Sequence, residues 1–112
     1  MEPFQIEVYQ TEDGAVPFQE WLDGLKSDQI RSQIVARIRR ASLGNFGDWK
    51  SLADSNGIRE MRIHSGGGFR IYYALVGRTV VLLLAGSGKG EQRRAIAHAK
   101  AYFTDYDRRR RS

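Results

Sequence analysis

The chain has 112 residues, of which 41% are hydrophobic and 28% are charged, so it has the length and composition of one globular domain, residues 1–112. It contains no cysteine, which excludes disulfides, a zinc ribbon and thiol catalysis and suits a reducing compartment. The longest apolar run, residues 80–85, is far shorter than the roughly 20 residues of a membrane span, and the first residues lack the basic and apolar regions of a signal peptide. We therefore expect a cytoplasmic protein.

The formal net charge of +5 is distributed unevenly. Residues 1–25 contain six acidic side chains and no Lys or Arg, whereas residues 59–100 contain eight basic side chains and only two acidic ones. Most of the basic residues are arginine, which suits bidentate contact with phosphate. The charge alone therefore favours a polyanionic partner, nucleic acid, over a merely solubilising surface.

The first half of the chain predicts a strand and two helices. Apolar side chains alternate over residues 4–8, as in a half-buried strand. Pro17 can open a short helix whose apolar positions repeat with helical spacing up to Leu25. Ser27 or Asp28 can cap a second helix, which Gly44 ends.

The second half predicts strands and a final helix. Residues 46–52 form a weak strand, residues 58–64 and 69–76 form a hairpin around the glycines 66–68, and residues 79–85 form a strand that is apolar on both faces and therefore central. A helix covers roughly residues 91–103, and the basic tail 107–112 is expected to be solvated and mobile. The predicted architecture is α+β, in the order β-α-α-β-β-β-α, with helices packed on one face of a mainly antiparallel four-stranded sheet.

Several catalytic motifs are excluded. The glycine-rich run 86–90 has leucine where the phosphate-binding loop needs its first glycine and glycine where that loop needs Ser or Thr, so it is at most an anion site built from backbone amides and Lys89. Two separate histidines without clustered carboxylates predict no metal site and no cofactor. No serine-hydrolase signature is present.

The hairpin is the most informative segment. If Met61, Ile63 and the alternating apolar residues of the next strand face the core, an open face carries four polar side chains. These are Arg62, His64, Arg70 and Tyr72. Arginines can hold a scissile phosphate, a histidine or tyrosine can move protons, and aromatic rings can stack bases. The alternative is an inert polar sheet face, on which Glu60 neutralises the two arginines.

Five segments resemble, in order and spacing, the phage-derived, HigB-like branch of the RelE/ParE toxin superfamily, also called addiction-module killer proteins. The resemblance covers about residues 4–103. The segments are residues 11–22, 38–48, 57–63, 68–73 and 80–89, the last followed by Gln92.

The resemblance implies the RelE-like fold and a toxin that arrests growth. The activity that it implies is metal-independent endoribonuclease (hydrolase) cleavage of mRNA on the translating ribosome, by attack of a 2′-hydroxyl on the neighbouring phosphate. The implied partners are the mRNA, the ribosome and a cognate helix-turn-helix antitoxin, HigA-like, in a toxin–antitoxin hetero-oligomer without a membrane. Arg70 matches the family's hairpin arginine, Arg62 a basic position of the preceding strand, and Lys89 the basic residue after the last strand.

The sequence also departs from the RelE branch at two places. That branch has a catalytic tyrosine in its final helix, where residues 95–98 of this chain include no tyrosine. It also has lysines on the strand before the hairpin turn, where this chain has Glu60. His64, His98 and Tyr72 all stay candidates for the general base. We expect further contacts to RNA phosphates from residues on the hairpin, the last loop and the final helix. These are Arg59, Lys89, Arg93, Arg94 and His98.

Two other functions compete with the interferase hypothesis. The same fold can serve a ParE-like inhibitor that poisons DNA gyrase by protein–protein contact, so the fold alone does not decide between them. A non-catalytic nucleic-acid-binding module needs only the basic surface.

Overall fold

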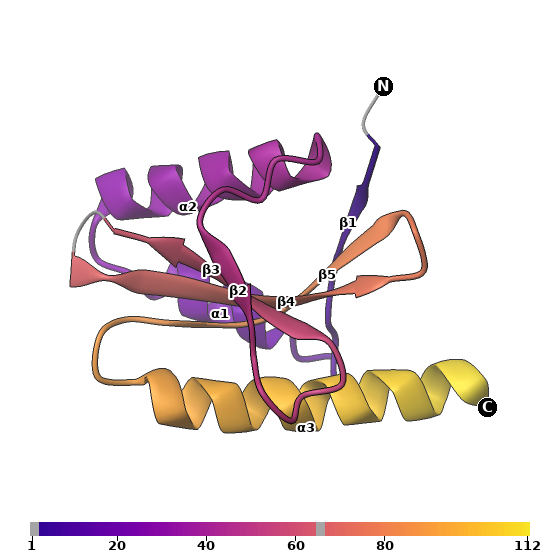
Figure 1. Ribbon diagram of the computed structural model, residues 1–112. Coiled ribbons are helices and arrows are strands. Elements are labelled where there is room, and N and C mark those ends of the chain that lie inside the picture. The colour runs from indigo at the N-terminus through magenta and orange to yellow at the C-terminus, as the bar shows by residue number, and fades with distance from the viewer. Residues whose placement is uncertain (1–2, 65–66) are drawn as a thin grey trace.

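The computed structural model describes residues 3–64 and 67–112, which form one mixed sheet with helices on both faces (Figure 1). The sheet has the strand order β1-β5-β4-β3-β2. Its strands are β1 (Gln5–Val8), β2 (Trp49–Ser51), β3 (Ile58–Ile63), β4 (Phe69–Val76) and β5 (Val80–Ser87). The helices are α1 (Pro17–Asp23), α2 (Asp28–Ser42) and α3 (Gln92–Arg111).

The α+β class and the mainly antiparallel sheet are confirmed, and the strand count is corrected. The weak strand expected at 46–52 does form, as β2, so the sheet has five strands instead of four. Only β1 and β5 run parallel. The turn expected at 66–68 lies partly outside the described residues, because Gly66 is not among them.

The two helices of the first half begin where the sequence predicts. Pro17 is in the first turn of α1, and the Ser27 hydroxyl caps α2 by accepting a hydrogen bond from the Ile30 amide at 3.2 Å. Gly44 follows the end of α2 with a φ of +93°, a conformation that glycine adopts at little cost.

The expectation that all helices lie on one face is wrong. Helices α1 and α2 cover one face through Phe18, Leu22 and Ile34, whereas α3 covers the other through Ala95 and Ala99 (Figure 1). Strand β5 is buried on both faces, as its continuous apolar run predicted. Two apolar layers therefore enclose the middle of the sheet.

Helix α3 is longer than expected and is tied to the start of the chain. It continues past residue 103 to Arg111, so residues 107–111 of the basic tail lie in its last turns. The Tyr9 hydroxyl donates a hydrogen bond to Asp105 at 2.6 Å, and Arg109 donates to the Gln10 carbonyl at 2.6 Å. Arginines within one turn of Asp105 and Asp107 form ion pairs with them, which supports helix in this segment. Within the described residues, no helix is both long and apolar enough to cross a bilayer.

Gly86 allows the closest approach between α1 and the sheet. A Cβ atom at this position would lie 2.2 Å from the Trp21 ring, because the indole lies directly against the β5 backbone. The Gly86→Ala variant should therefore lower the free energy of unfolding by about 1–3 kcal/mol through overpacking. Urea unfolding measures this, with Gly88→Ala as the matched control, since its Cβ would meet only ordinary contacts. Equal stability of the two variants would contradict the contact.

The contact between Tyr9 and Asp105 predicts a low pKa for the Asp105 carboxyl. Chiefly because Tyr9 donates a hydrogen bond to it, the pKa of the Asp105 carboxyl is lowered from 3.8 to about 2. The contact between Tyr9 and Asp105 therefore stabilises the fold fully when the pH is above the ordinary carboxyl pKa of 3.8. This stabilisation is lost as the pH falls through the pKa of the folded protein, about 2. A carboxyl NMR titration should give a midpoint near 2, and Tyr9→Phe should move it toward 3.8. An ordinary midpoint in the unchanged protein would contradict the contact.

Candidate nucleic-acid interface

The β3–β4 hairpin places two arginines directly opposite each other. Arg62 pairs with Arg70 in the sheet register, and two like charges at such positions repel. Glu60 offsets this repulsion, because its Oε2 atom lies 3.0 Å from Arg62 Nε and 3.3 Å from Arg70 Nε. The Glu60 side chain is only 5% exposed, so the two cations surround a nearly buried carboxylate.

The Glu60 contacts leave hydrogen-bonding capacity on the guanidinium groups. Glu60 contacts both arginines through Nε, and the buried Nη1 atom of Arg70 has no hydrogen-bond partner. The exposed parts of the two side chains, 33% of Arg62 and 24% of Arg70, can donate charge-assisted hydrogen bonds to an oxyanion. The hydrogen bond that Arg62 donates to Glu60 raises the pKa of Arg62, so this group stays cationic. The arrangement can therefore bind a phosphate.

Lys50 is a third cation of this cluster, and the sequence analysis missed it. It pairs with Glu60 across β2 and β3, which places both side chains on the same face of the sheet. Its strand was too weak in sequence to assign a register, so no pattern indicated the side to which Lys50 points. We call Lys50, Glu60, Arg62 and Arg70 the arginine cluster.

Tyr72 does not belong to an open face, and this part of the prediction is wrong. Its side chain is completely buried among residues that pack beneath α3, and its hydroxyl lies 3.1 Å from the Ser87 hydroxyl. Burial also raises the pKa of its phenol. Alternation assigned Tyr72 to the correct side of β4, but α3 covers that side, and the sequence analysis had expected it to be free.

His64 lies just beyond the end of β3 and is highly exposed. Its Nε2 atom is 2.5 Å from Oδ2 of Asp48, whose pKa is lowered chiefly by this hydrogen bond. The Asp48 carbonyl also accepts a hydrogen bond from the Arg62 amide at 2.9 Å. Asp48 therefore connects His64 to the strand that carries Arg62.

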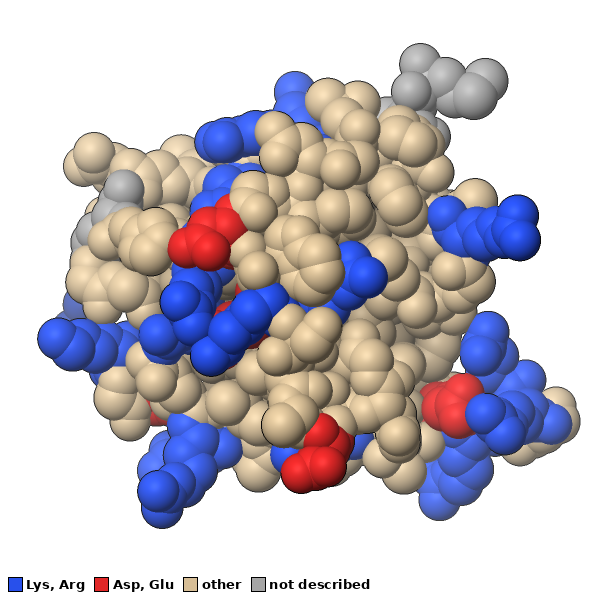
Figure 2. All heavy atoms as spheres, viewed as in Figure 1, with Lys and Arg blue, Asp and Glu red and all other residues tan. Residues whose placement is uncertain are grey.

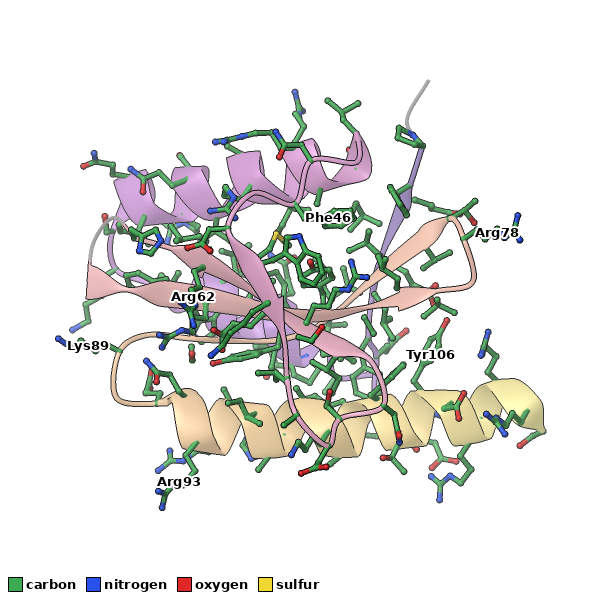
Figure 3. The ribbon with its side chains drawn as sticks, viewed as in Figure 1. Phe46, Arg62, Arg78, Lys89, Arg93 and Tyr106 are labelled. Atoms are coloured by element: carbon green, nitrogen blue, oxygen red, sulfur yellow. The ribbon has the colours of Figure 1, made fainter. Side chains whose placement is uncertain are left out.

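The other expected phosphate contacts divide into separate groups. Lys89 and Arg93 are exposed in the loop after β5 and in the first turn of α3, and Figure 3 shows them at the same end of the molecule as Arg62. In Figure 2 basic side chains gather at this end, where an acidic group borders them, and a second basic group lies at the lower right. Arg59 lies on the opposite face of the sheet, where its guanidinium stacks 4.1 Å from the centre of the Trp49 ring.

Arg94 and His98 lie elsewhere, on the flank of α3 that faces α1. They line a pocket of about 190 Å³ together with Trp21 and Tyr102. The His98 and Tyr102 rings stack with their centres 5.9 Å apart. The arginine cluster thus lies on the β2–β4 part of the sheet. Arg94 and His98 lie apart from it, in the pocket between α1 and α3. Within the described ranges 3–64 and 67–112, no group of three or more His, Asp or Glu side chains could hold a metal ion.

Glu60 should be essential to the packing of the two arginines. Because Glu60→Gln leaves them opposed without a counter-charge, we expect it to lower the free energy of unfolding by roughly 1–3 kcal/mol, less than for a fully buried pair, since the arginines are partly exposed. Thermal unfolding measures this, with Glu12→Gln, at an exposed turn, as the control. Added phosphate should restore more stability to Glu60→Gln than to the unchanged protein. No loss of stability would show that the arginines do not depend on Glu60.

Three comparisons with known proteins agree with this architecture. Residues 20–104 match the family described as phage-derived protein Gp49-like. An uncharacterized protein of Haemophilus influenzae is 43% identical over 83 residues, which are 74% of this chain and 82% of that protein. A mutant of the E. coli toxin RelE in its free state has a similar fold, with a TM-score of 0.62, 18% identity, and coverage of 88% of this chain and 95% of that one. The expected RelE-like fold is thus confirmed, and the chain belongs to the Gp49-like family of phage-derived proteins.

Proposed function

We propose that this chain is the toxin of a type II toxin–antitoxin system, of the HigB-like branch, and that it cleaves mRNA on the translating ribosome. The observation that carries the proposal is the arginine cluster, in which Glu60 holds the partly exposed Arg62 and Arg70 at opposite positions and Lys50 lies on the same face. Such a site suits a phosphodiester, the group at which an mRNA interferase acts. Membership of the Gp49-like family and the RelE-like fold support the same function.

The proposed reaction needs no metal. Arg62 and Arg70 hold the scissile phosphate, and the 2′-hydroxyl of the preceding ribose attacks the phosphorus while the bond to the next 5′-oxygen breaks. The products are a 2′,3′-cyclic phosphate and a 5′-hydroxyl, so one proton leaves the 2′-oxygen and one reaches the 5′-oxygen. The two guanidinium groups stabilise the extra negative charge of the pentacoordinate transition state.

His64 is our candidate for the proton transfer. Tyr72 is buried with its hydroxyl against Ser87, and His98 lines the separate pocket between α1 and α3. His64 is exposed at the end of the strand that carries Arg62, and its contact with Asp48 fixes the orientation of the ring.

We also propose the partners and the location that follow from this function. The toxin acts in the cytoplasm, and a helix-turn-helix antitoxin of the HigA type binds it in a hetero-oligomer. An acidic segment of the antitoxin would be complementary to the basic residues 59–100. Lys89 and Arg93 provide further contacts to the RNA backbone near the arginine cluster.

Arg70→Ala should abolish cleavage while the protein stays folded, because Glu60 keeps its ion pair with Arg62 when the Arg70 side chain is removed. We expect at least a 100-fold loss, the size typical for removal of a transition-state donor. Primer extension on a reporter mRNA in a translating extract measures new 3′ ends. The control is Arg78→Ala, in the turn between β4 and β5 at the opposite end of the sheet from Lys89 (Figure 3).

The other functions predict different results in the same extract. Intact mRNA together with trapped gyrase–DNA breaks would favour a ParE-like inhibitor. Intact mRNA without gyrase damage would favour a nucleic-acid-binding module. An unfolded Arg70→Ala protein would contradict the position assigned to this side chain.

A further inference from the structure

Trp49 is an exposed aromatic side chain at the edge of the sheet. It is the first residue of β2, one of the two edge strands, and 40% of it is exposed. Of the large apolar residues that are exposed in the described part of the chain, the other two, Val35 and Leu43, are aliphatic residues in or next to α2. An indole ring in this position loses the stabilisation that burial would give it, so its exposure calls for an explanation.

Arg59 gives the Trp49 ring a cationic, planar neighbour. Its guanidinium lies 4.1 Å from the ring centre, within the range of a cation–π contact. The two side chains come from paired strands and project on the same face, because Trp49 pairs with Met61 and Ser51 pairs with Arg59. Both an indole and a guanidinium can stack on a nucleobase. We call Trp49 and Arg59 the stacking pair.

The stacking pair lies on the opposite face of the sheet from the arginine cluster, and β2 connects the two. Lys50 of the arginine cluster follows Trp49 in β2. Asp48, which precedes Trp49, accepts a hydrogen bond from the Arg62 amide through its carbonyl oxygen. Because β2 is an edge strand, which lies in front of the other strands in Figure 1, a strand of RNA that crosses this edge can reach both faces of β2. Phe46, in the loop before β2, and Arg62 are both visible from this side in Figure 3.

We propose that the stacking pair binds one unpaired nucleobase of the RNA strand whose phosphates lie on Lys50, Arg62 and Arg70. This inference rests on the proposed function and adds to it a site that would orient the substrate. The cationic surroundings of Trp49 favour a ligand that combines a planar ring with negative charge. An apolar protein segment would bury these charges without compensation.

The test uses a single-stranded RNA oligonucleotide made non-cleavable by 2′-O-methyl groups. Binding should quench the fluorescence of the unchanged protein, and Trp49→Leu, which keeps Trp21, should show no such quenching and bind about tenfold more weakly. Trp49→Phe should retain most of the affinity, since a ring remains. Val35→Ala, which truncates another exposed apolar residue, should bind as the unchanged protein does.

A series of oligonucleotides, each with one abasic position, identifies the contact. One abasic oligonucleotide should bind the unchanged protein about tenfold more weakly than the intact oligonucleotide does. Trp49→Leu should bind that abasic oligonucleotide and the intact one equally well, because the substitution and the missing base remove the same stacking contact. Equal losses in both proteins, or no quenching of Trp49, would overturn the inference. Circular dichroism confirms that each variant is folded.

These results are independent of the cleavage assay. Quenching of Trp49 without any cleavage in the extract would retain the stacking site and reject the ribonuclease. Cleavage that is unaffected by Trp49→Leu, together with unchanged RNA affinity, would reject the stacking site and retain the ribonuclease. If Trp49→Leu weakened binding to a protein partner and left RNA binding unchanged, Trp49 would belong to a protein interface. That result would also overturn the inference.

Discussion

The nearly buried Glu60 carboxylate lets β3 and β4 present two arginines at opposite positions. Without it, Arg62 and Arg70 would repel each other in the sheet register, and either side chain could reduce the repulsion by turning away. With it, both guanidiniums are anchored at Nε, and the Nη1 atom of Arg70 stays unpaired. An acidic residue thus organises a site that prefers anions, because it fixes the cations and neutralises only part of their charge.

Helix α3 determines how much of the sheet remains available around that site. It packs through Ala95 and Ala99, whose small side chains allow it to approach the sheet closely. This contact buries Tyr72 in the middle of β4 and leaves Arg70, at the start of β4, partly exposed beside Arg62 and Lys50. The same helix thus completes the core and limits the accessible basic surface to one end of the hairpin.

Much of the fold could be predicted from the sequence, because its strongest signals are local. The helix signals at Pro17 and Ser27, the alternation in the hairpin and the doubly apolar strand at Val80 all correspond to observed elements. The side of the sheet to which each hairpin residue points was also correct. The alternation of apolar and polar residues does not indicate which face of the sheet a distant helix covers. For that reason Tyr72 was expected on an open face, although α3 covers it.

The site was predicted less completely than the fold, because two of its features depend on tertiary pairing. Lys50 and Trp49 lie on a three-residue strand whose sequence has no clear alternation, and only its register against β3 assigns their faces. Arg59 was expected to contact an RNA phosphate, which stays a prediction, and the structure adds a contact with Trp49 that the sequence analysis did not consider. Arg94 and His98 lie on a different flank of α3, since helical spacing turns them toward α1.

The parallel pairing of β1 with β5 has a consequence for the order of assembly. Gln5 pairs with Val80, so the first strand stays without its neighbour until the chain has been made through β5. Helix α3, which holds Tyr9 through Asp105, is made later still. Contacts between residues so distant in sequence slow folding, and here they make it depend on β5 and α3. The domain therefore cannot be completed before α3 has been made and can reach Tyr9.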